Sequence, residues 1–442
     1  MPTPDELLRV IGHGVVPAPE LRERLGTSPA TLSRLMAQVG ELVVRLGRAR
    51  ATSYARPRVL PEVGWRAPIH RVGEDGRPRR QGEAIFLASG GTWVADEGGR
   101  GKLFVGLPPW ANDMAPQGYL GRSFAARYPE LHLPLSVSDW SDDQRLVALA
   151  RRGEDCIGNI ILGHESLDRW LPSTVQRVSR DDYPALARDA GASPSGSSAG
   201  GEHPKFPAFV GTGQVLVKFV PAGSAESVAR WRDLLACERL ALDVVRRAGI
   251  AAAEAEVVDL EGQRFLEVRR FDRVGARGRR GVVSLGAISR ELYGDLDSWT
   301  LAAVRLERDR RLSPEDGRRV RWLDVFGQLI ANIDRHFWNI SFFTGDGGDG
   351  DVGDGPLRLA PAYDVLPMLF APTDAGIPDR ALEPAPPGSN TLDVWRDAAE
   401  QAELFWDTVS RDVLLSAGFQ AIATHCRARV ATARRRFQDV LS

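Results

Sequence analysis

A short polar segment, Asp334 to Asn339, carries the residue spacing with the clearest chemical meaning in this chain. Asp334 follows an apolar, helix-like segment, and Asn339 lies five residues later at the start of a β-prone segment. A carboxylate can orient a hydroxyl and accept its proton. An amide oxygen can bind Mg²⁺ without adding charge beside a transferred phosphate. The spacing therefore indicates phosphoryl transfer, with Asp334 as the candidate catalytic base and Asn339 as a candidate Mg²⁺ ligand.

A second acidic residue, Asp364, follows a short β-prone segment one predicted hairpin beyond Asn339. In kinases an aspartate after the catalytic loop holds the Mg²⁺ that bridges the β- and γ-phosphates. The alternative is that Asp364 caps the helix that follows it. The order Asp334, Asn339, Asp364 favours the metal-binding interpretation, because an Asp-x-x-x-x-Asn spacing alone arises often by chance.

Lysine is rare in this chain: only Lys102, Lys205 and Lys218 occur among 57 basic residues, and the others are arginine. A compact ammonium reaches a phosphate as a point charge, and a planar guanidinium does not replace it. Lys218 lies in the predicted strand VLVKFV, and Glu238 lies on the predicted helix 227–248 that follows. We interpret Lys218 as a ligand of ATP phosphates that Glu238 holds in place. The alternatives are a surface lysine and a solvated helix carboxylate.

The elements that must position these residues follow from apolar periodicity. Five apolar residues recur at helical spacing just before the catalytic segment, and they predict one buried face of a helix that ends at Asp334. These residues are Leu323, Phe326, Leu329, Ile330 and Ile333. A Gly/Ser-rich segment at 191–204 predicts a loop ahead of the lysine strand, and 345–355 predicts an acidic loop tip. We divide the chain into 1–60, a β-rich part at 61–185, and a catalytic core with a helical C-terminal lobe at 186–442.

Residues 1–60 predict a winged helix-turn-helix domain. Thr3-Pro4 begins one helix, Gly26 ends a second, and Ser28-Pro29 caps a third. Two short strands around a glycine-containing turn follow, which is the pattern of a wing. The segment has nine arginines and five acidic residues. The residues that we expect to contact duplex DNA lie on the exposed side of the third helix and in the wing: Thr31, Arg34, Gln38, Arg48 and Arg50. The alternative is a helical hairpin that contacts protein.

Composition limits the class of protein. A chain of 442 residues with 43% hydrophobic content is long enough for two or three globular domains. The net charge of -1 does not point to nucleic acid, so only local basic patches can. We find no apolar run of membrane-spanning length and no basic-then-apolar leader, and the three cysteines match no zinc spacing. These features predict a cytoplasmic protein without a membrane partner.

An ordered set of motifs extends these observations over most of the chain. In chain order they are GLPPWANDMAPQGYLGR, DCIGNIILG, SSAGGEHPKF, VLVKF, LEVRRFDR, NIDRHFWN and LAPAYDVLP. From about Gly82 to Arg427 the set resembles the HipA family, the kinase toxins of bacterial toxin–antitoxin systems. The resemblance implies an α+β chain with a bilobal protein-kinase-like (HipA-like) fold behind the N-terminal winged helix-turn-helix.

The resemblance also implies roles for single residues. Asp334 would be the catalytic base, Asn339 and Asp364 would bind Mg²⁺, and Lys218 would hold the phosphates of ATP. A regulatory serine lies in the Gly/Ser loop of the family, and Ser197 matches it best here, with Ser195 and Ser198 close by. The implied activity is phosphorylation of a Ser or Thr hydroxyl on a protein, such as an aminoacyl-tRNA synthetase or another translation component.

The chain departs from the usual family pattern because a helix-turn-helix segment is fused in front of the kinase part. It resembles the subgroup of single-chain homologues, so a separate antitoxin is compatible with the sequence but not required. A second hypothesis is a DNA-binding transcriptional regulator whose kinase fold is an inactive or sensing module. A third is a kinase of small-molecule hydroxyls on the same fold. The first is favoured because every expected phosphate-binding and metal-binding position is filled.

Overall fold

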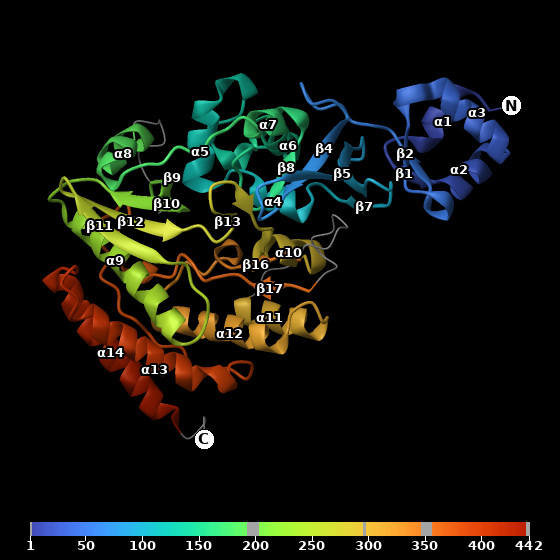
Figure 1. Cartoon of the computed structure of the whole chain (residues 1–442). Coiled ribbons are helices and arrows are strands. Elements are labelled where there is room, and N and C mark those ends of the chain that lie inside the picture. Colours follow the sequence, from blue (N-terminus) through green and yellow to red (C-terminus); the bar gives the residue numbers. More distant parts are fainter. Residues whose placement is uncertain (1, 192–202, 295–297, 346–355, 439–442) are drawn as a thin grey trace. The chain divides into compact units, whose positions relative to one another are not determined.

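A computed structural model describes residues 2–191, 203–294, 298–345 and 356–438 (Figure 1). The chain is a mixed α and β protein that divides into two compact units. The first unit contains residues 2–116 and 129–174. The second contains residues 117–128 and the described residues from 175 onward. Within the described ranges, no helix combines the length and the apolar character that crossing a bilayer requires.

The N-terminal residues form three helices and a three-stranded antiparallel sheet of order β1-β3-β2. Their bounds are α1 Pro4–Ile11, β1 Val15–Pro17, α2 Ala18–Leu25, α3 Pro29–Val39, β2 Val44–Leu46 and β3 Ser53–Ala55. The hydroxyl of Thr3 accepts a bond from the Glu6 amide at 3.3 Å, and the Glu6 carboxylate accepts one from the Thr3 amide at 2.9 Å. Ser28 caps α3, and Gly26 ends α2 with φ of 55°. The three predicted helices are therefore confirmed, together with their capping residues.

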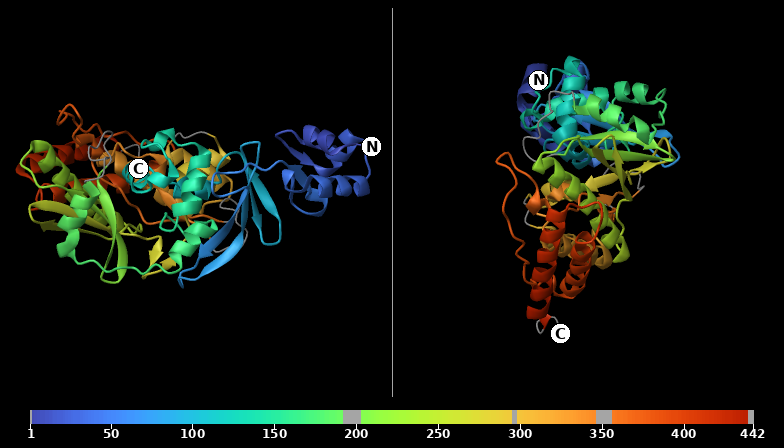
Figure 2. Two further views of the ribbon diagram at one scale, coloured as in Figure 1. Left: turned by 90° about the horizontal axis from the view of Figure 1, so that it is seen from above. Right: turned by 90° about the vertical axis from the view of Figure 1, so that its left-hand side faces the viewer.

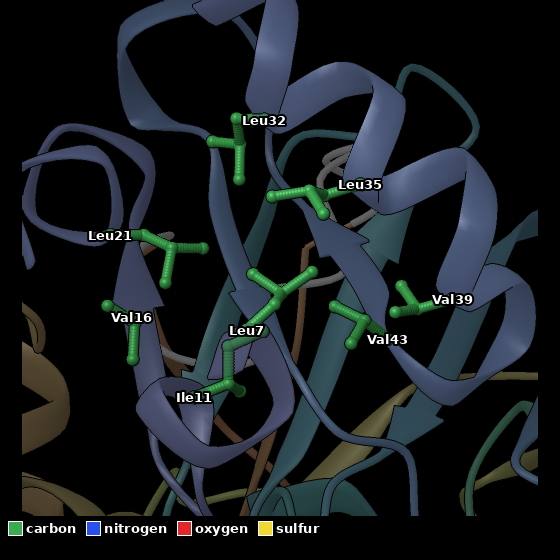
Figure 3. Close-up of a cluster of buried hydrophobic side chains, with 8 residues drawn as sticks. All are labelled: Leu7, Ile11, Val16, Leu21, Leu32, Leu35, Val39 and Val43. Atoms are coloured by element: carbon green, nitrogen blue, oxygen red, sulfur yellow. The ribbon is translucent and has the colours of Figure 1, made fainter. Parts of the chain in front are cut away.

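These helices enclose a small hydrophobic core of their own (Figure 3). The buried side chains come from all three helices, from β1 and from the residues after α3: Leu7, Ile11, Val16, Leu21, Leu32, Leu35, Val39 and Val43. On α3, Leu32 and Leu35 are buried and Met36 is partly buried. The apolar residues of α3 therefore form the side of this helix that faces the core.

The strands β2 and β3 share a second core with the sheet that follows. Val44, Leu46 and Ala55 pack with Ile85 and Leu87 in one buried cluster. The backbone continues this contact, because the Arg58 amide donates to the Phe86 carbonyl at 2.8 Å. Buried apolar contacts therefore join these strands to the sheet that follows.

The rest of the first unit is a five-stranded sheet of order β7-β6-β5-β4-β8 in which every pairing is antiparallel. Its strands are β4 Arg66–Val72, β5 Pro78–Phe86, β6 Thr92–Asp96, β7 Gly101–Phe104 and β8 Ile160–Leu162. The helices of this part are α4 Pro109–Met114, α6 Asp142–Arg152 and α7 His164–Trp170. These strands lie within the part at 61–185 that the sequence predicts to be β-rich.

An ion-pair cluster joins α6 to α7. The Glu165 carboxylate accepts from Arg151 at 2.9 Å and from Arg169 at 2.7 Å, and it also contacts Arg152. Burial by itself would raise the pKa of Glu165, but hydrogen bonds from the three guanidinium groups lower it to about 2. The ionised form of Glu165 is therefore favoured by folding.

Glu165→Gln is expected to destabilise the protein in a pH-dependent way. Because folding lowers the pKa of Glu165 from 4.5 to about 2, its contribution is present above about pH 4.5 and is lost as the pH falls towards 2. The thermal unfolding temperature of Glu165→Gln should lie below that of the wild type at pH 7, and the difference should shrink between these two pH values. Glu97→Gln, at an exposed carboxylate between β6 and β7, is the control. A constant difference at every pH would contradict the assignment.

The second unit begins with a four-stranded antiparallel sheet of order β11-β12-β10-β9. Its strands are β9 Lys205–Val210, β10 Gly213–Val220, β11 Ala255–Leu260 and β12 Gln263–Arg269. The helix α8, Tyr183–Gly191, covers one face, and the long helix α9, Glu226–Arg247, covers the other (Figure 1). A further short helix, α5 Gly118–Arg127, contacts β9. The predicted lysine strand and the long helix after it are confirmed.

The remainder of the second unit is mainly helical. Its helices are α10 Leu285–Leu292, α11 Trp299–Arg308, α12 Pro314–Leu329, α13 Leu392–Val409 and α14 Ala417–Arg436. The pairs α12 with α13 and α13 with α14 lie side by side (Figures 1 and 2). The short strands β15 Val282–Ser284, β16 Ser341–Phe343 and β17 Arg358–Leu359 form one antiparallel sheet, and β13 Arg273–Val274 pairs with β14 Gly278–Arg279.

One helix boundary differs from the prediction. The helix before the catalytic segment ends at Leu329 and not at Asp334. Ala331 has φ of 62°, and the Asn332 amide turns back to the Gly327 carbonyl at 2.8 Å, which closes the helix one turn early. Ile333, which we expected on the buried face, is 58% exposed. Asp334 therefore belongs to an irregular loop.

Candidate catalytic site

The strand β10 presents Lys218 on the face of the sheet that α9 covers. Successive side chains of a strand point to opposite faces. Val217 and Phe219 belong to the core on the α8 side, and Val220 belongs to the core on the α9 side. Lys218 therefore points towards α9, where Glu238 lies completely buried.

Lys218 is bound between two carboxylates that come from distant parts of the chain. Its Nζ atom donates to both Glu238 oxygens, at 2.7 and 2.6 Å, and it also pairs with Asp364. Only 6% of Lys218 is exposed, so the surface-lysine alternative is wrong, and the solvated-helix alternative for Glu238 is wrong as well. A buried ammonium held by a helix carboxylate is the arrangement that binds nucleotide phosphates in kinases.

The charges in this cluster oppose the effect of burial. Burial lowers the pKa of Lys218, but Asp364 and Glu238 raise it above its usual value. Burial raises the pKa of Glu238, and the neighbouring ammonium opposes that rise. For Asp364 the ammonium prevails over burial and holds the pKa well below its usual range. Lys218 is thus held as a cation and Asp364 as an anion.

Asp364 lies in a turn that presents its carboxylate to Lys218. Its φ of 53° falls in the left-handed region, which aspartate tolerates better than most residues. The residue before the next short helical turn, Met368–Phe370, is Pro367, and α13 does not begin until Leu392. Asp364 therefore does not cap a helix, and this alternative is wrong.

Two asparagines hold the backbone of Asp334. The side-chain oxygen of Asn332 accepts a bond from the Asp334 amide at 3.0 Å. The Nδ2 atom of Asn339 donates to the Asp334 carbonyl at 2.9 Å. Both asparagines are buried, whereas about half of the Asp334 side chain is exposed. The backbone is therefore constrained while the carboxylate stays accessible.

The charges of Lys218 and Asp364 act on the Asp334 carboxylate. Burial raises its pKa, and the negative charge of Asp364 raises it further. His336, whose Nε2 atom is 3.9 Å from the carboxylate, opposes this when it is protonated, and so does Lys218. A carboxylate with a raised pKa accepts a proton more readily than an ordinary aspartate does.

Asn339 and Asp364 carry the kinds of oxygen atom that a divalent cation prefers. Because Nδ2 of Asn339 is used by the Asp334 carbonyl, its amide oxygen is the atom left to bind a metal. Asp364 offers a carboxylate that is held ionised. Mg²⁺ prefers a few such oxygen ligands together with water and phosphate oxygens. Asn339 and Asp364 would therefore hold Mg²⁺, and Lys218 would hold the phosphates of ATP.

Several neighbours of the site were missed by the sequence analysis. Lys205 pairs directly with Lys218 across β9 and β10, so both lysines lie on one face of the sheet. The ring of His203 lies 4.9 Å from that of Trp231, and its Nε2 atom has no partner among the described residues. Burial, and then the charge of Lys218, lower the pKa of His203 to about 3. The closeness of Lys205 to Lys218 in a lysine-poor chain was the one signal available. No pattern in the sequence indicated the partial burial of His203.

The remaining predicted residues lie elsewhere. Ser197 and its loop are outside the described residues, as is most of the acidic tip at 345–355. Arg34 and Gln38 of α3 are exposed, and so are Arg48 and Arg50 between β2 and β3.

Thr31 is half-buried and belongs to the helix cap. Its hydroxyl contacts that of Ser28 at 3.1 Å and accepts a bond from Arg34 at 3.3 Å.

Two protein-family models and one known relative match the chain. Residues 197–440 match the model of the HipA-like C-terminal domain, and residues 63–171 match that of the YjjJ-like toxin middle domain. Toxin YjjJ of Escherichia coli strain K12 is 36% identical over 435 residues, which is 95% of each chain.

Two solved structures are also similar. A chain of the Shewanella oneidensis MR-1 complex of HipA, HipB and operator DNA aligns with a TM-score of 0.50 at 14% identity, covering 85% of this chain and 98% of that one. The Helicobacter pylori proinflammatory kinase CtkA aligns with a TM-score of 0.39 at 13% identity, over 56% of this chain and 95% of that one. Since one family model spans more than half of its length and a relative of 36% identity spans nearly all of it, the chain belongs to the HipA family of toxins.

Proposed function

We propose that this chain is an ATP- and Mg²⁺-dependent Ser/Thr protein kinase of the HipA toxin type. The observation that carries the proposal is the convergence of Lys218, Glu238 and Asp364 in one buried ion cluster beside Asp334 and Asn339. Each of these side chains has the chemistry that phosphoryl transfer needs at its position.

The residues would divide the work as follows. When bound, ATP would supply the phosphoryl group that is transferred. Mg²⁺ would supply positive charge that stabilises this group. Lys218, held by Glu238, would orient the phosphates, and Asn339 and Asp364 would hold the metal. Asp334 would orient the acceptor hydroxyl and take its proton. This division leaves little covalent chemistry to the protein, so the rate depends on positioning.

Two other functions remain as hypotheses. A transcriptional regulator with an inactive kinase fold would need none of these contacts, and the contacts of Lys218 with Glu238 and Asp364 speak against it. A kinase of small-molecule hydroxyls would use the same site. The protein substrate that we propose, such as a translation component, rests on the family alone.

Incubation of the purified protein with Mg-ATP, followed by mass spectrometry, tests the proposal without a known substrate. We expect a mass gain of one phosphate on a serine of the 191–204 loop, with Ser197 as the expected site. Ser197→Ala should remove or move the modification. Unmodified protein and intact ATP after prolonged incubation, both alone and with a bacterial lysate, would favour the inactive-fold hypothesis.

The N-terminal part, residues 1–60, is proposed as a winged helix-turn-helix that binds duplex DNA. Arg34 and Gln38 are exposed on α3, the helix expected in the major groove, and Arg48 and Arg50 are exposed in the wing. The similar Shewanella structure is a complex of HipA, HipB and its operator DNA, so we extend DNA binding to this chain as a proposal. A fused DNA-binding part would make a separate antitoxin unnecessary for operator binding, though compatible with it.

Arg48 and Arg50 are expected to bind phosphates without regard to sequence. Replacing both by glutamine in the full chain should weaken binding to every duplex and reduce the slope of log K against log salt by about 1.8, at roughly 0.9 per contact. Arg34→Gln should instead alter sequence preference. Arg58→Gln is the matched control, because Arg58 lies in the same segment but pairs with Asp143 at 3.0 Å. Equal slopes for the double variant and the control would contradict the proposal.

A further inference from the structure

A buried carboxylate in α12, Asp324, lies at the base of the catalytic loop. It is only 4% exposed, and all of its polar contacts in the structure are hydrogen bonds that it accepts. One oxygen accepts from the amide and the hydroxyl of Thr300, at 3.2 and 2.7 Å, in the first turn of α11. The other accepts from Nε of Arg335 at 3.1 Å. Asp324 therefore ties two helices to the residue that follows Asp334.

Arg335 extends this link to the backbone of the catalytic base. Its Nη1 atom donates to the Asn332 carbonyl, and the side chain of Asn332 accepts from the Asp334 amide at 3.0 Å. A second contact comes from α11, where the Trp299 indole donates to the His336 carbonyl at 3.3 Å. Residues on both sides of Asp334 are thus bound to α11 and α12.

A glycine in the last part of α12 makes room for this arrangement. A Cβ atom at Gly327 would lie 2.6 Å from Cδ of Arg335, so any side chain there would displace the arginine. Glycine inside a helix costs about 0.5–1 kcal/mol relative to alanine. Glycine at this position is thus explained by the arginine that lies across the helix.

A partly buried ion pair adds little net stability, because removing charges from water offsets most of their attraction, but it can fix one geometry. Asp334 lies in an irregular loop, so its backbone is not fixed by the regular hydrogen bonds of a helix or strand. A misplacement of about 1 Å at a reacting group can cost 10²-fold in rate. The pair Asp324–Arg335 is placed to prevent such a misplacement.

We propose that Asp324 is a positioning residue that acts on phosphoryl transfer through Arg335 and the backbone of Asp334. The expected effects on rate rest on the proposed kinase activity. The expected constraint on the loop around Asp334 does not rest on it. The hydrogen bonds of Asp324 go to Thr300, Gln328 and Arg335. Its effect should therefore depend on the presence of Asp334.

A double-mutant cycle tests that dependence in the full chain, with autophosphorylation as the readout. Asp324→Asn should lower the rate at saturating Mg-ATP by about 10- to 100-fold while the KM for ATP stays within about 2-fold. In an Asp334→Asn background the same change should have almost no further effect. An equal loss in both backgrounds would overturn the proposal, because it would mean that Asp324 acts on general stability. Arg335→Gln, which removes the contact from the loop side, must give the same pattern.

Amide hydrogen exchange supplies a readout that needs no activity. Asp324→Asn and Arg335→Gln should each reduce protection of the peptide spanning residues 331–339. Asp397→Asn is the matched control, because Asp397 lies on α13 and accepts a bond from the Trp322 indole of α12 at 2.5 Å. Unchanged protection in both test variants would overturn the positioning role. If the wild type transfers no phosphate, the proposed function fails, and the exchange result still decides this inference.

Discussion

Asp334→Asn is expected to reduce phosphoryl transfer by about 10²- to 10⁴-fold, the usual contribution of a general base. The amide keeps the shape of the side chain but cannot accept the proton of the acceptor hydroxyl. Nucleotide affinity should change little, because the phosphate and metal ligands lie on other residues. The removal of one negative charge near Asp364 should even favour the binding of an anionic nucleotide slightly. Radiolabel transfer and ATP affinity, measured on both proteins, check the two halves of this expectation.

The control for this variant is Asp168→Asn, at an exposed aspartate of α7 in the first unit. It should retain full activity and full ATP affinity. Unchanged transfer in Asp334→Asn would refute the assignment of the base. Loss of ATP binding together with transfer would indicate that Asp334 supports the nucleotide site and not proton transfer.

Lys218→Arg is expected to reduce transfer by roughly 10²-fold, although arginine serves nearly everywhere else in this chain. The ammonium lies at 2.6–2.7 Å from the Glu238 oxygens with only 6% of the residue exposed, so a larger planar group cannot enter without moving its neighbours. Overpacking of a buried position typically costs about 1–3 kcal/mol, and a displaced cation would misplace the phosphates. The rate and the KM for ATP should both worsen.

The other two lysines provide the comparison. Lys102→Arg, at the first-unit lysine that lies over the Phe104 ring, should leave transfer unchanged. Lys205→Arg tests the neighbour of Lys218 on the same sheet face. Full activity in Lys218→Arg with a loss in Lys205→Arg would show that Lys205 is the phosphate-binding lysine.

Local signals in the sequence were enough to predict many of the elements. The caps at Thr3 and Ser28 and the stop at Gly26 each act within one helical turn, so they can be identified without knowing the fold. Residue chemistry and order also identified Lys218 as an unusual residue. Short-range signals of this kind depend less on tertiary context than pairings between distant residues do.

Contacts between distant residues were decided only by the tertiary structure. Lys218 and Asp364 are 146 residues apart, and their pairing depends on how the sheet and the helical part pack. The end of α12 at Leu329 could not be predicted from apolar spacing, because the period continues to Ile333 while the backbone turns at Ala331.

Two arginines also show that residue type alone does not determine the partner of a side chain. Arg335 and Arg58 look alike in the sequence, yet one joins Asp324 beneath the catalytic loop and the other pairs with Asp143. Residue type and spacing determined which groups this protein has for chemistry. Packing determined which of them are buried, which are paired and which remain accessible, because burial and Coulomb interactions depend on distances that local periodicity does not contain.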